Sequence, residues 1–422
     1  MIQRTTRRAL LGVTAAGLVL PGAALAQGQR LRMTWWGGAD RARRTRAALD
    51  AWQRLNPGAQ VDSETVGWGD YWTRLATQAA GGNAPDVLQM DYRYIYEYAR
   101  RRALRPMDEF MPEPLDIRDF GAANIDLGRV DGRLFGVAMG INSTAMLYDT
   151  TVFERLRIEP PKVGTTWAQF AEIATQVARN AGRRGYFGTE DAGMNEPALE
   201  AFVRGRGRPL YADDGKLGMV REDAAEWFDF WDKLRRAGAA AAGDVQAMYR
   251  NTPETSLIVT NRAAMIFTHS NLLIAHQGLT QNKLGMTAYP LGAEPGQYYK
   301  PSMLLSMSAT AGNPREAVRL IDFLSESREA GESLGVERGV PPSAKRREQL
   351  AATVPEGDRI QIDYIAAISR VVGQIPPPPP SGAGEIENLL RRMNERVAFG
   401  QLRVPQAAEE FVAEAGRVLG RA

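Results

Sequence analysis

Side chains that usually carry covalent or redox chemistry are scarce in this sequence. It contains no cysteine and two histidines, His269 and His276. The lack of cysteine excludes disulfides, thiolate metal sites and cysteine nucleophiles. Two histidines do not favour a histidine-rich metal site. We therefore expect no metal site.

Tryptophans and glycines meet where short apolar runs end. The stretch LRMTWWGG, residues 31–38, places Trp35 and Trp36 at the end of a predicted strand. Neighbouring side chains on a strand point to opposite faces, so at most one of these rings enters the same core layer. We expect Trp36 to face an opening that the following glycines keep clear. Trp68 lies between two glycines and is expected to face the same opening.

The elements that position these side chains alternate between short apolar strands and amphipathic helices, a pattern typical of an α/β fold. Thr166 followed by Gln169 predicts a capping box at a helix start. Asn313-Pro314 followed by Glu316 predicts another helix start. The segment Asn195-Glu196-Pro197 is expected in a loop. Strands are predicted at 31–36, 59–66 and 86–91, and helices at about 40–55, 70–80 and 405–420.

The first 26 residues have the features of a secretory signal peptide. A basic start with Arg4, Arg7 and Arg8 precedes an apolar stretch that ends at Ala24-Leu25-Ala26. The segment Thr6-Arg7-Arg8-Ala9-Leu10-Leu11 is similar to a twin-arginine export signal. Removing residues 1–26 takes the formal net charge from +3 to zero, because they hold three arginines and no acid. We expect a periplasmic protein with no overall charge that would favour nucleic acid or anionic membranes.

Seven stretches together resemble the family-1 extracellular solute-binding proteins of ABC sugar importers. They occur in the family's order and are LRMTWWGG, AALDAWQRLNPGAQV, YWTRLATQAAGGNAPDVLQMD, DGRLFGVAMGINSTAMLYD, TTWAQFAEIA, AAMIFTHSNLL and LGMTAYPLG. The resemblance implies a two-lobed α/β fold of the type II periplasmic-binding-protein class, in which each lobe is a mixed sheet flanked by helices. It places the first lobe at 27–139 plus 288–326 and the second at 140–287 plus 327–422, with a hinge between them. It also implies a monomer that binds a sugar or oligosaccharide reversibly, with no cofactor and no catalytic residues, and delivers it to an inner-membrane permease.

A sugar has apolar CH faces and hydroxyl edges, so its cleft needs aromatic rings and hydrogen-bonding groups. Ligands of open α/β sheets bind beyond the carboxyl ends of the strands. Two alternatives stay open at this point: Asp91 could only cap a helix, and Tyr71 could be a core residue. Tyr94, Tyr98, Trp227 and Trp231 are expected in cores. The candidate ligand-binding residues are Trp36, Arg41, Trp68, Tyr71, Asp91, Tyr92, Asn142, Trp167, Glu196, Asn271, Tyr299 and Ser302.

The chemistry of the ligand has more than one interpretation. Arg41 follows the Trp-Trp-Gly-Gly turn and could bind the carboxylate of a uronate-containing sugar; otherwise it lies on a solvated helix face. A secreted glycoside hydrolase is the alternative function, because aromatic rings and paired carboxylates suit hydrolysis as well. A ferric-iron-binding transport protein is a lesser alternative, since Tyr298 and Tyr299 are adjacent and tyrosines can ligate iron.

Overall fold

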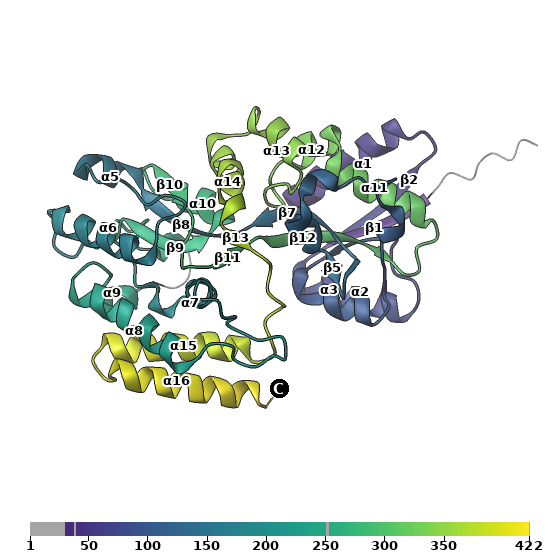
Figure 1. Cartoon of the computed structure of the whole chain (residues 1–422). Helices are drawn as coiled ribbons and strands as arrows, with labels where there is room; N and C mark the ends of the chain where they lie inside the picture. The colour runs from purple at the N-terminus through teal and green to yellow at the C-terminus, as the bar shows by residue number, and fades with distance from the viewer. Residues whose placement is uncertain (1–29, 38, 250–252, 422) are drawn as a thin grey trace, which may run out of the picture.

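A computed structural model describes residues 30–37, 39–249 and 253–421, arranged as two groups of elements joined by crossing segments (Figure 1). The predicted signal peptide lies outside the described residues. Among the helices of these ranges, none combines the length and the apolar character needed to cross a lipid bilayer.

The first group is built on a sheet with strand order β2-β1-β3-β12-β4, in which β7 also pairs with β12. Strand β1 runs parallel to β2 and β3, whereas β12 is antiparallel to its neighbours. Helices α1, α11 and α12 pack together on one side of this sheet, and α2 and α3 lie on the other (Figure 1). The bounds are β1 Arg30–Trp36, α1 Ala39–Leu55, β2 Gln60–Val66, α2 Trp68–Ala80, β3 Val87–Met90, α3 Tyr92–Arg100, β4 Leu104–Arg105, α4 Ala122–Asp126, β5 Arg129–Val130, β6 Arg133–Leu134, β7 Val137–Asn142, β12 Lys300–Ser308, α11 Pro314–Glu326 and α12 Arg328–Leu334.

The second group is built on the antiparallel sheet β10-β8-β9. Helices α8, α15 and α16 pack against one another (Figure 1), and Trp231 of α8 contacts Phe267 of β9 with ring centroids 5.7 Å apart. Trp227 and Trp231 on α8 have no exposed surface, as predicted. The bounds are β8 Thr144–Asp149, α5 Thr150–Leu156, α6 Trp167–Asn180, α7 Glu196–Arg204, α8 Arg221–Arg236, α9 Gly243–Gln246, β9 Met265–His269, α10 Leu273–Gln277, β10 Leu284–Thr287, α15 Ala383–Ala398 and α16 Val404–Leu419.

The two groups are joined where β7 continues through Ser143 into β8. The buried Ser143 hydroxyl donates to the carbonyl of Tyr298 at 2.8 Å, and Ile141 exchanges backbone hydrogen bonds with Val340. A separate apolar core, which includes Ile141 and Tyr299, fills this crossing region. The elements that complete it are β11 Gln297–Tyr298, α13 Ala344–Ala351, α14 Glu356–Ala367 and β13 Val372–Gly373.

The apolar cores show which chain segments pack together. One core combines residues between Leu31 and Met139 with residues between Met303 and Leu334. Another combines residues between Met146 and Tyr289 with residues between Ile386 and Ala415. Helix α12 lies beyond the expected crossing at Glu326, yet it packs against α1 in the first core. The lobe boundaries themselves stay a prediction.

Local sequence signals set several helix starts. Thr166 and Gln169 form the expected reciprocal capping box at α6, and Asn313 caps α11 with Pro314 in its first turn. The expected loop at Asn195-Glu196-Pro197 is wrong, because Glu196 begins α7. The Asn195 side chain accepts from the Ala198 amide at 3.0 Å and proline occupies the first turn, which is a favourable way to start a helix.

Candidate functional site

A cavity of about 700 Å³ lies between the two groups of elements and takes residues from both. We call it the interlobe hollow. Its size is that of a small-molecule binding site. The first group contributes Trp68, Asp91, Tyr92, Arg93, Lys300 and Pro301 to its lining. The second contributes Thr144, Glu196, Pro197, Glu200, Tyr211, His269, Ala383 and Gly384, and the segments between the groups contribute Tyr298 and residues 376–382.

Trp68 presents an aromatic face to this hollow. It is the first residue of α2 and is 45% exposed. Its ring meets Trp36 edge-on, with centroids 5.0 Å apart, and meets Trp72 in the same way at 5.3 Å. Trp72 in turn packs on Tyr94 at 4.0 Å. These contacts fix the orientation of Trp68 in advance, so that its free face can receive the apolar face of a ring.

Carboxyl groups supply much of the polar wall. Asp91 caps α3 by accepting from the Arg93 amide at 2.8 Å, and it still borders the hollow. Glu196 is half-buried at the start of α7. Burial, followed by the nearby carboxylates of Glu200 and Glu387, raises the pKa of Glu196 to about 8. At neutral pH this side chain is therefore largely protonated, and it can donate as well as accept hydrogen bonds.

Basic and neutral groups complete the wall. Lys300 is exposed at the start of β12. Burial and the charge of Lys300 lower the pKa of His269 to about 4, so its imidazole is neutral at physiological pH. The hydroxyl of Tyr298 donates to Glu200 at 2.9 Å, and the guanidinium of Arg204 lies 5.0 Å from the centre of the Tyr298 ring. The hollow thus offers both donors and acceptors.

Five consecutive prolines, Pro376–Pro380, form one side of the hollow. The hydroxyl of Tyr92 donates to the carbonyl of Pro376 at 2.5 Å, which links α3 to this segment. Prolines have no amide hydrogen, so their backbone can accept but cannot donate hydrogen bonds. This side therefore offers ring CH groups and carbonyl oxygens.

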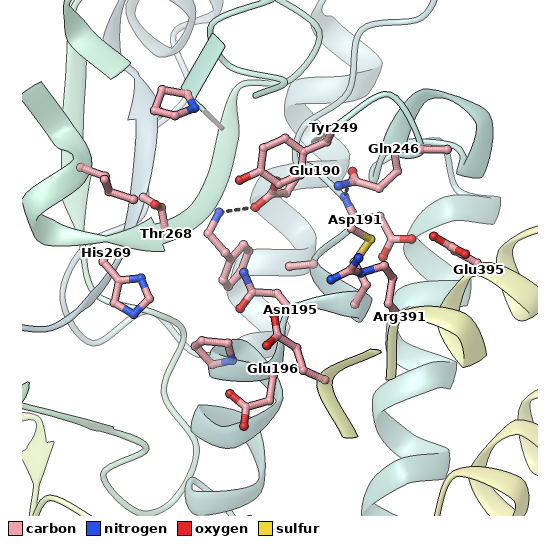
Figure 2. A pocket seen from close by; sticks show the side chains of 18 of the residues that line it. Glu190, Asp191, Asn195, Glu196, Gln246, Tyr249, Thr268, His269, Arg391 and Glu395 are labelled. Carbon is pink, nitrogen blue, oxygen red and sulfur yellow. Dashed lines mark hydrogen bonds between the residues drawn. The ribbon is translucent and has the colours of Figure 1, made fainter. Parts of the chain in front are cut away.

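A second cavity of about 510 Å³ adjoins the hollow and shares Glu196, Pro197 and His269 with it. We call it the side pocket. Figure 2 shows Glu196 and His269 at one end and Glu190 beside Tyr249 at the other. Its remaining lining residues are Asp191, Ala192, Met194, Asn195, Gln246, Ala247, Pro253, Phe267, Thr268, Leu272, His276, Glu387, Arg391 and Glu395.

Several predicted site residues line a different cavity, of about 920 Å³, beside the crossing strands: Arg41, Asn142, Asn271 and Ser302. They are not brought together with Trp68. Arg41 forms an ion pair with Glu337 at 2.7 Å, so its charge is already matched. The hydroxyl of Ser302 donates to the carbonyl of Gly140 at 3.0 Å and also contacts the carbonyl of Arg338. These bonds hold the crossing segments together.

Other predicted site residues are buried in cores and line none of these three cavities: Trp36, Tyr71, Trp167 and Tyr299. Trp36 lies beneath Trp68, because helices cover both faces of the first sheet and both neighbouring tryptophans become buried. The Tyr71 hydroxyl donates to the Gln89 carbonyl, and that of Tyr299 to the Ile365 carbonyl. The expected positions of these residues are therefore corrected, and we leave them out of the proposed site.

The structure thus brings together Trp68, Asp91, Tyr92 and Glu196 from the predicted set. It adds Lys300, Glu200 and Tyr211, which sequence reasoning missed. Lys300 precedes a buried strand and resembles any exposed lysine in the sequence. Glu200 and Tyr211 carry no motif; only the fold places them beside Glu196. His269 borders the hollow, whereas the predicted site residue Asn271, two positions later in the chain, lines the cavity beside the crossing strands.

Known bacterial binding proteins are similar to this chain in sequence. A sequence model of the bacterial extracellular solute-binding proteins matches residues 47–355, well over half of the chain. A protein of Brucella abortus (strain 2308) that carries the name of a binding protein is 20% identical over 372 residues, covering 87% of this chain and 88% of its own.

Solved structures agree. A family 1 extracellular solute-binding protein from Alicyclobacillus acidocaldarius is 28% identical, with a TM-score of 0.85 over 92% of this chain and 98% of its own. A periplasmic oligogalacturonide-binding protein from Yersinia enterocolitica is 23% identical, with a TM-score of 0.78 over 93% of this chain and 99% of its own. The matches confirm the predicted fold class. The chain belongs to the bacterial extracellular solute-binding proteins.

Proposed function

We propose that this protein binds a sugar or oligosaccharide in the interlobe hollow and delivers it to an ABC permease. The observation that carries the proposal is the composition of the hollow. An exposed, supported indole at Trp68 faces carboxyl, ammonium and imidazole groups that come from other parts of the chain. A sugar ring can place its apolar face on the indole and form hydrogen bonds to the polar groups through its hydroxyls. The solute class named for the Yersinia enterocolitica protein supports a carbohydrate ligand.

Binding acts through the relative position of the two lobes. The lobes move about the segments near Ser143 and Lys300, and a ligand that touches both walls favours the closed arrangement. A ligand shifts this balance only by its additional affinity for the closed form; moving from about 1:99 to 99:1 takes about 5.5 kcal/mol. Contacts to Trp68 and Asp91 on one wall, and to Glu196 and His269 on the other, supply that difference. We further propose that residues 1–26 direct export to the periplasm, by the twin-arginine route.

Whether the site can bind a charged ligand depends on which cationic side chains line the hollow. Arg41, the predicted partner of a uronate, is paired with Glu337 outside the hollow. Arg93 and Lys300 line the hollow and take its place as candidates for a carboxylate. The proposed ligand is therefore a sugar that can carry a uronate unit next to Lys300.

The experiment is a thermal-shift screen of neutral and uronic oligosaccharides, followed by small-angle scattering with each sugar that binds. A ligand held only by the native state raises the melting temperature, and closure lowers the radius of gyration. Saturation by a sugar with an unchanged radius would contradict closure. A screen in which no sugar raises the melting temperature would contradict the carbohydrate assignment.

The alternatives make different predictions in the same assays. A glycoside hydrolase releases new reducing ends during incubation with an oligosaccharide, whereas a binding protein releases none. Iron binding through adjacent tyrosines needs both hydroxyls at one point. In the structure the Tyr298 hydroxyl donates to Glu200 and the Tyr299 hydroxyl donates to the Ile365 carbonyl, so the two are held apart by different partners.

A further inference from the structure

The side pocket adjoins the interlobe hollow. Glu196, Pro197 and His269 border both cavities. A ligand unit seated on Trp68 would use part of the hollow, and the side pocket beyond the shared residues extends from His269 and Glu196 to Glu190 and Tyr249 (Figure 2). Together the two cavities offer more room than a single sugar ring requires.

His276 places an unmatched acceptor on the wall of the side pocket. Its ring Nδ1 lies 2.8 Å from the carbonyl of Leu272. A carbonyl only accepts, so Nδ1 carries the proton and Nε2 is left as a bare acceptor. The residue is 2% exposed, and Nε2 has no hydrogen-bond partner among the described residues. A buried polar atom without a partner is costly, and a ligand hydroxyl would supply the donor that Nε2 lacks among the described residues.

The other polar groups of the side pocket also suit hydroxyls. Glu190 is 3% exposed and accepts from the Phe267 amide at 2.5 Å. Burial raises the pKa of Glu190 to about 8, so the group is mostly a neutral acid at pH 7. His269 is a neutral imidazole, with one donor and one acceptor. A hydroxyl can donate to one group and accept from another, and therefore fits this mixture.

A carboxylate fits the side pocket poorly. It would lie near the carboxyl groups of Glu190, Glu196, Glu387 and Glu395, with the guanidinium of Arg391 as the one cation among the lining residues. Ionised carboxyl groups would repel it, and the neutral ones would be driven further toward their protonated form. Cations on the wall of the interlobe hollow, by contrast, include Lys300 and Arg93.

We infer that the side pocket is a second subsite that takes a neutral, polyhydroxylated unit of an extended ligand, with the His276 imidazole accepting one of its hydroxyls. This inference rests on the proposed function. It adds that the ligand has at least two units and that the inner unit, which occupies the side pocket, is neutral. The outer unit rests on Trp68, and His269 contacts the ligand where it turns into the side pocket.

The presence of two histidines makes a direct test possible. The protein is labelled with [15N]histidine, and its ring signals are assigned with the variants His269→Gln and His276→Gln. It is then titrated with neutral sugars and their dimers, namely glucose with maltose and cellobiose, galactose with galactobiose, and xylose with xylobiose, and also with digalacturonic acid. Tryptophan fluorescence is recorded in parallel to report binding in the interlobe hollow.

We expect a monosaccharide to shift the His269 signals alone, and a neutral disaccharide to shift His269 and also the Nε2 signal of His276. If fluorescence responds but His276 stays unchanged with every sugar, the side pocket is not a subsite, while the proposed function stands. If His276 responds only to digalacturonic acid, the neutral assignment is wrong. If neither fluorescence nor either histidine responds to any sugar, both the proposed function and this inference fall.

A variant gives an independent measurement. His276→Leu removes the acceptor and should weaken disaccharide binding about fivefold to tenfold while leaving monosaccharide binding unchanged. Ile274→Ala is the matched control, because Ile274 lies on the same helix, α10, is 49% exposed and does not line the side pocket. Equal losses for the two sugar lengths would contradict the subsite.

Discussion

Replacing Trp68 with alanine is the sharpest test of the proposed site. A fully buried tryptophan costs about 3–5 kcal/mol when truncated. Trp68 is 45% exposed, so we expect its loss to lower the free energy of unfolding by about 2 kcal/mol. Removal of a central aromatic contact typically makes the free energy of binding less favourable by at least about 2 kcal/mol, which corresponds to a dissociation constant about 30-fold larger.

The assay is calorimetric titration with a sugar identified in the thermal screen, alongside denaturant unfolding of the free protein. Trp68→Phe keeps a ring face and should lose less affinity than Trp68→Ala. Phe399→Ala is the matched control, since Phe399 is a 51% exposed aromatic that lines none of the three cavities. Sugar binding by Trp68→Ala within twofold of the parent protein would refute the placement of the ligand on this indole.

Three further predictions follow from buried and charged groups. Glu190→Gln should stabilise the protein increasingly as the pH rises from about 4.5 toward about 8, because the raised pKa of Glu190 makes its ionisation unfavourable in the folded state. The measurement is the melting temperature of the variant and of the parent protein across this pH range. A difference between the two that does not change with pH would argue against the prediction. Arg235→Met should lower the free energy of unfolding by about 3–5 kcal/mol, because it leaves the buried carboxylate of Asp191 without the guanidinium that lies 2.7 Å from it. Urea unfolding measures this loss. A loss under about 1 kcal/mol would be inconsistent with a stabilising ion pair. Lys300→Gln should weaken the binding of digalacturonic acid about threefold to fivefold at low salt and leave the binding of neutral sugars unaffected. Calorimetric titration measures both affinities. An equal effect on the acidic and the neutral sugars would mean that the Lys300 ammonium does not contact a carboxylate.

Much of the fold could be predicted from local patterns. The strand predicted at 31–36 is Arg30–Trp36, and the final helix predicted at about 405–420 is Val404–Leu419. Thr166 and Asn313 act as the caps that their neighbours indicated. These features depend on residues a few positions apart, and periodicity and capping report such short-range relations well.

The site was harder to predict because its parts are far apart in the sequence. Alternation along β1 separates Trp35 from Trp36, but it does not show that helices cover both faces of the sheet. Arg41 follows a turn, as a ligand-binding arginine would, yet its partner Glu337 lies 296 residues away. Nothing near Lys300 in the sequence indicates that Glu196 and His269 lie across from it. Residues that are distant in the sequence but close in the fold decide which polar side chains already have a partner within the protein and which can bind a ligand.

The run Pro376–Pro380 limits how the molecule can adapt to its ligand. Proline-rich segments are extended and stiff, and change length very little. The run leads from β13 into α15, and the Tyr92 hydroxyl bonds to its first carbonyl. A spacer of fixed length cannot shorten to accommodate a smaller solute. In the proposed closing motion, the width of the interlobe hollow would therefore be adjusted by rotation elsewhere in the backbone, and solutes too short to bridge that span would gain little from closure.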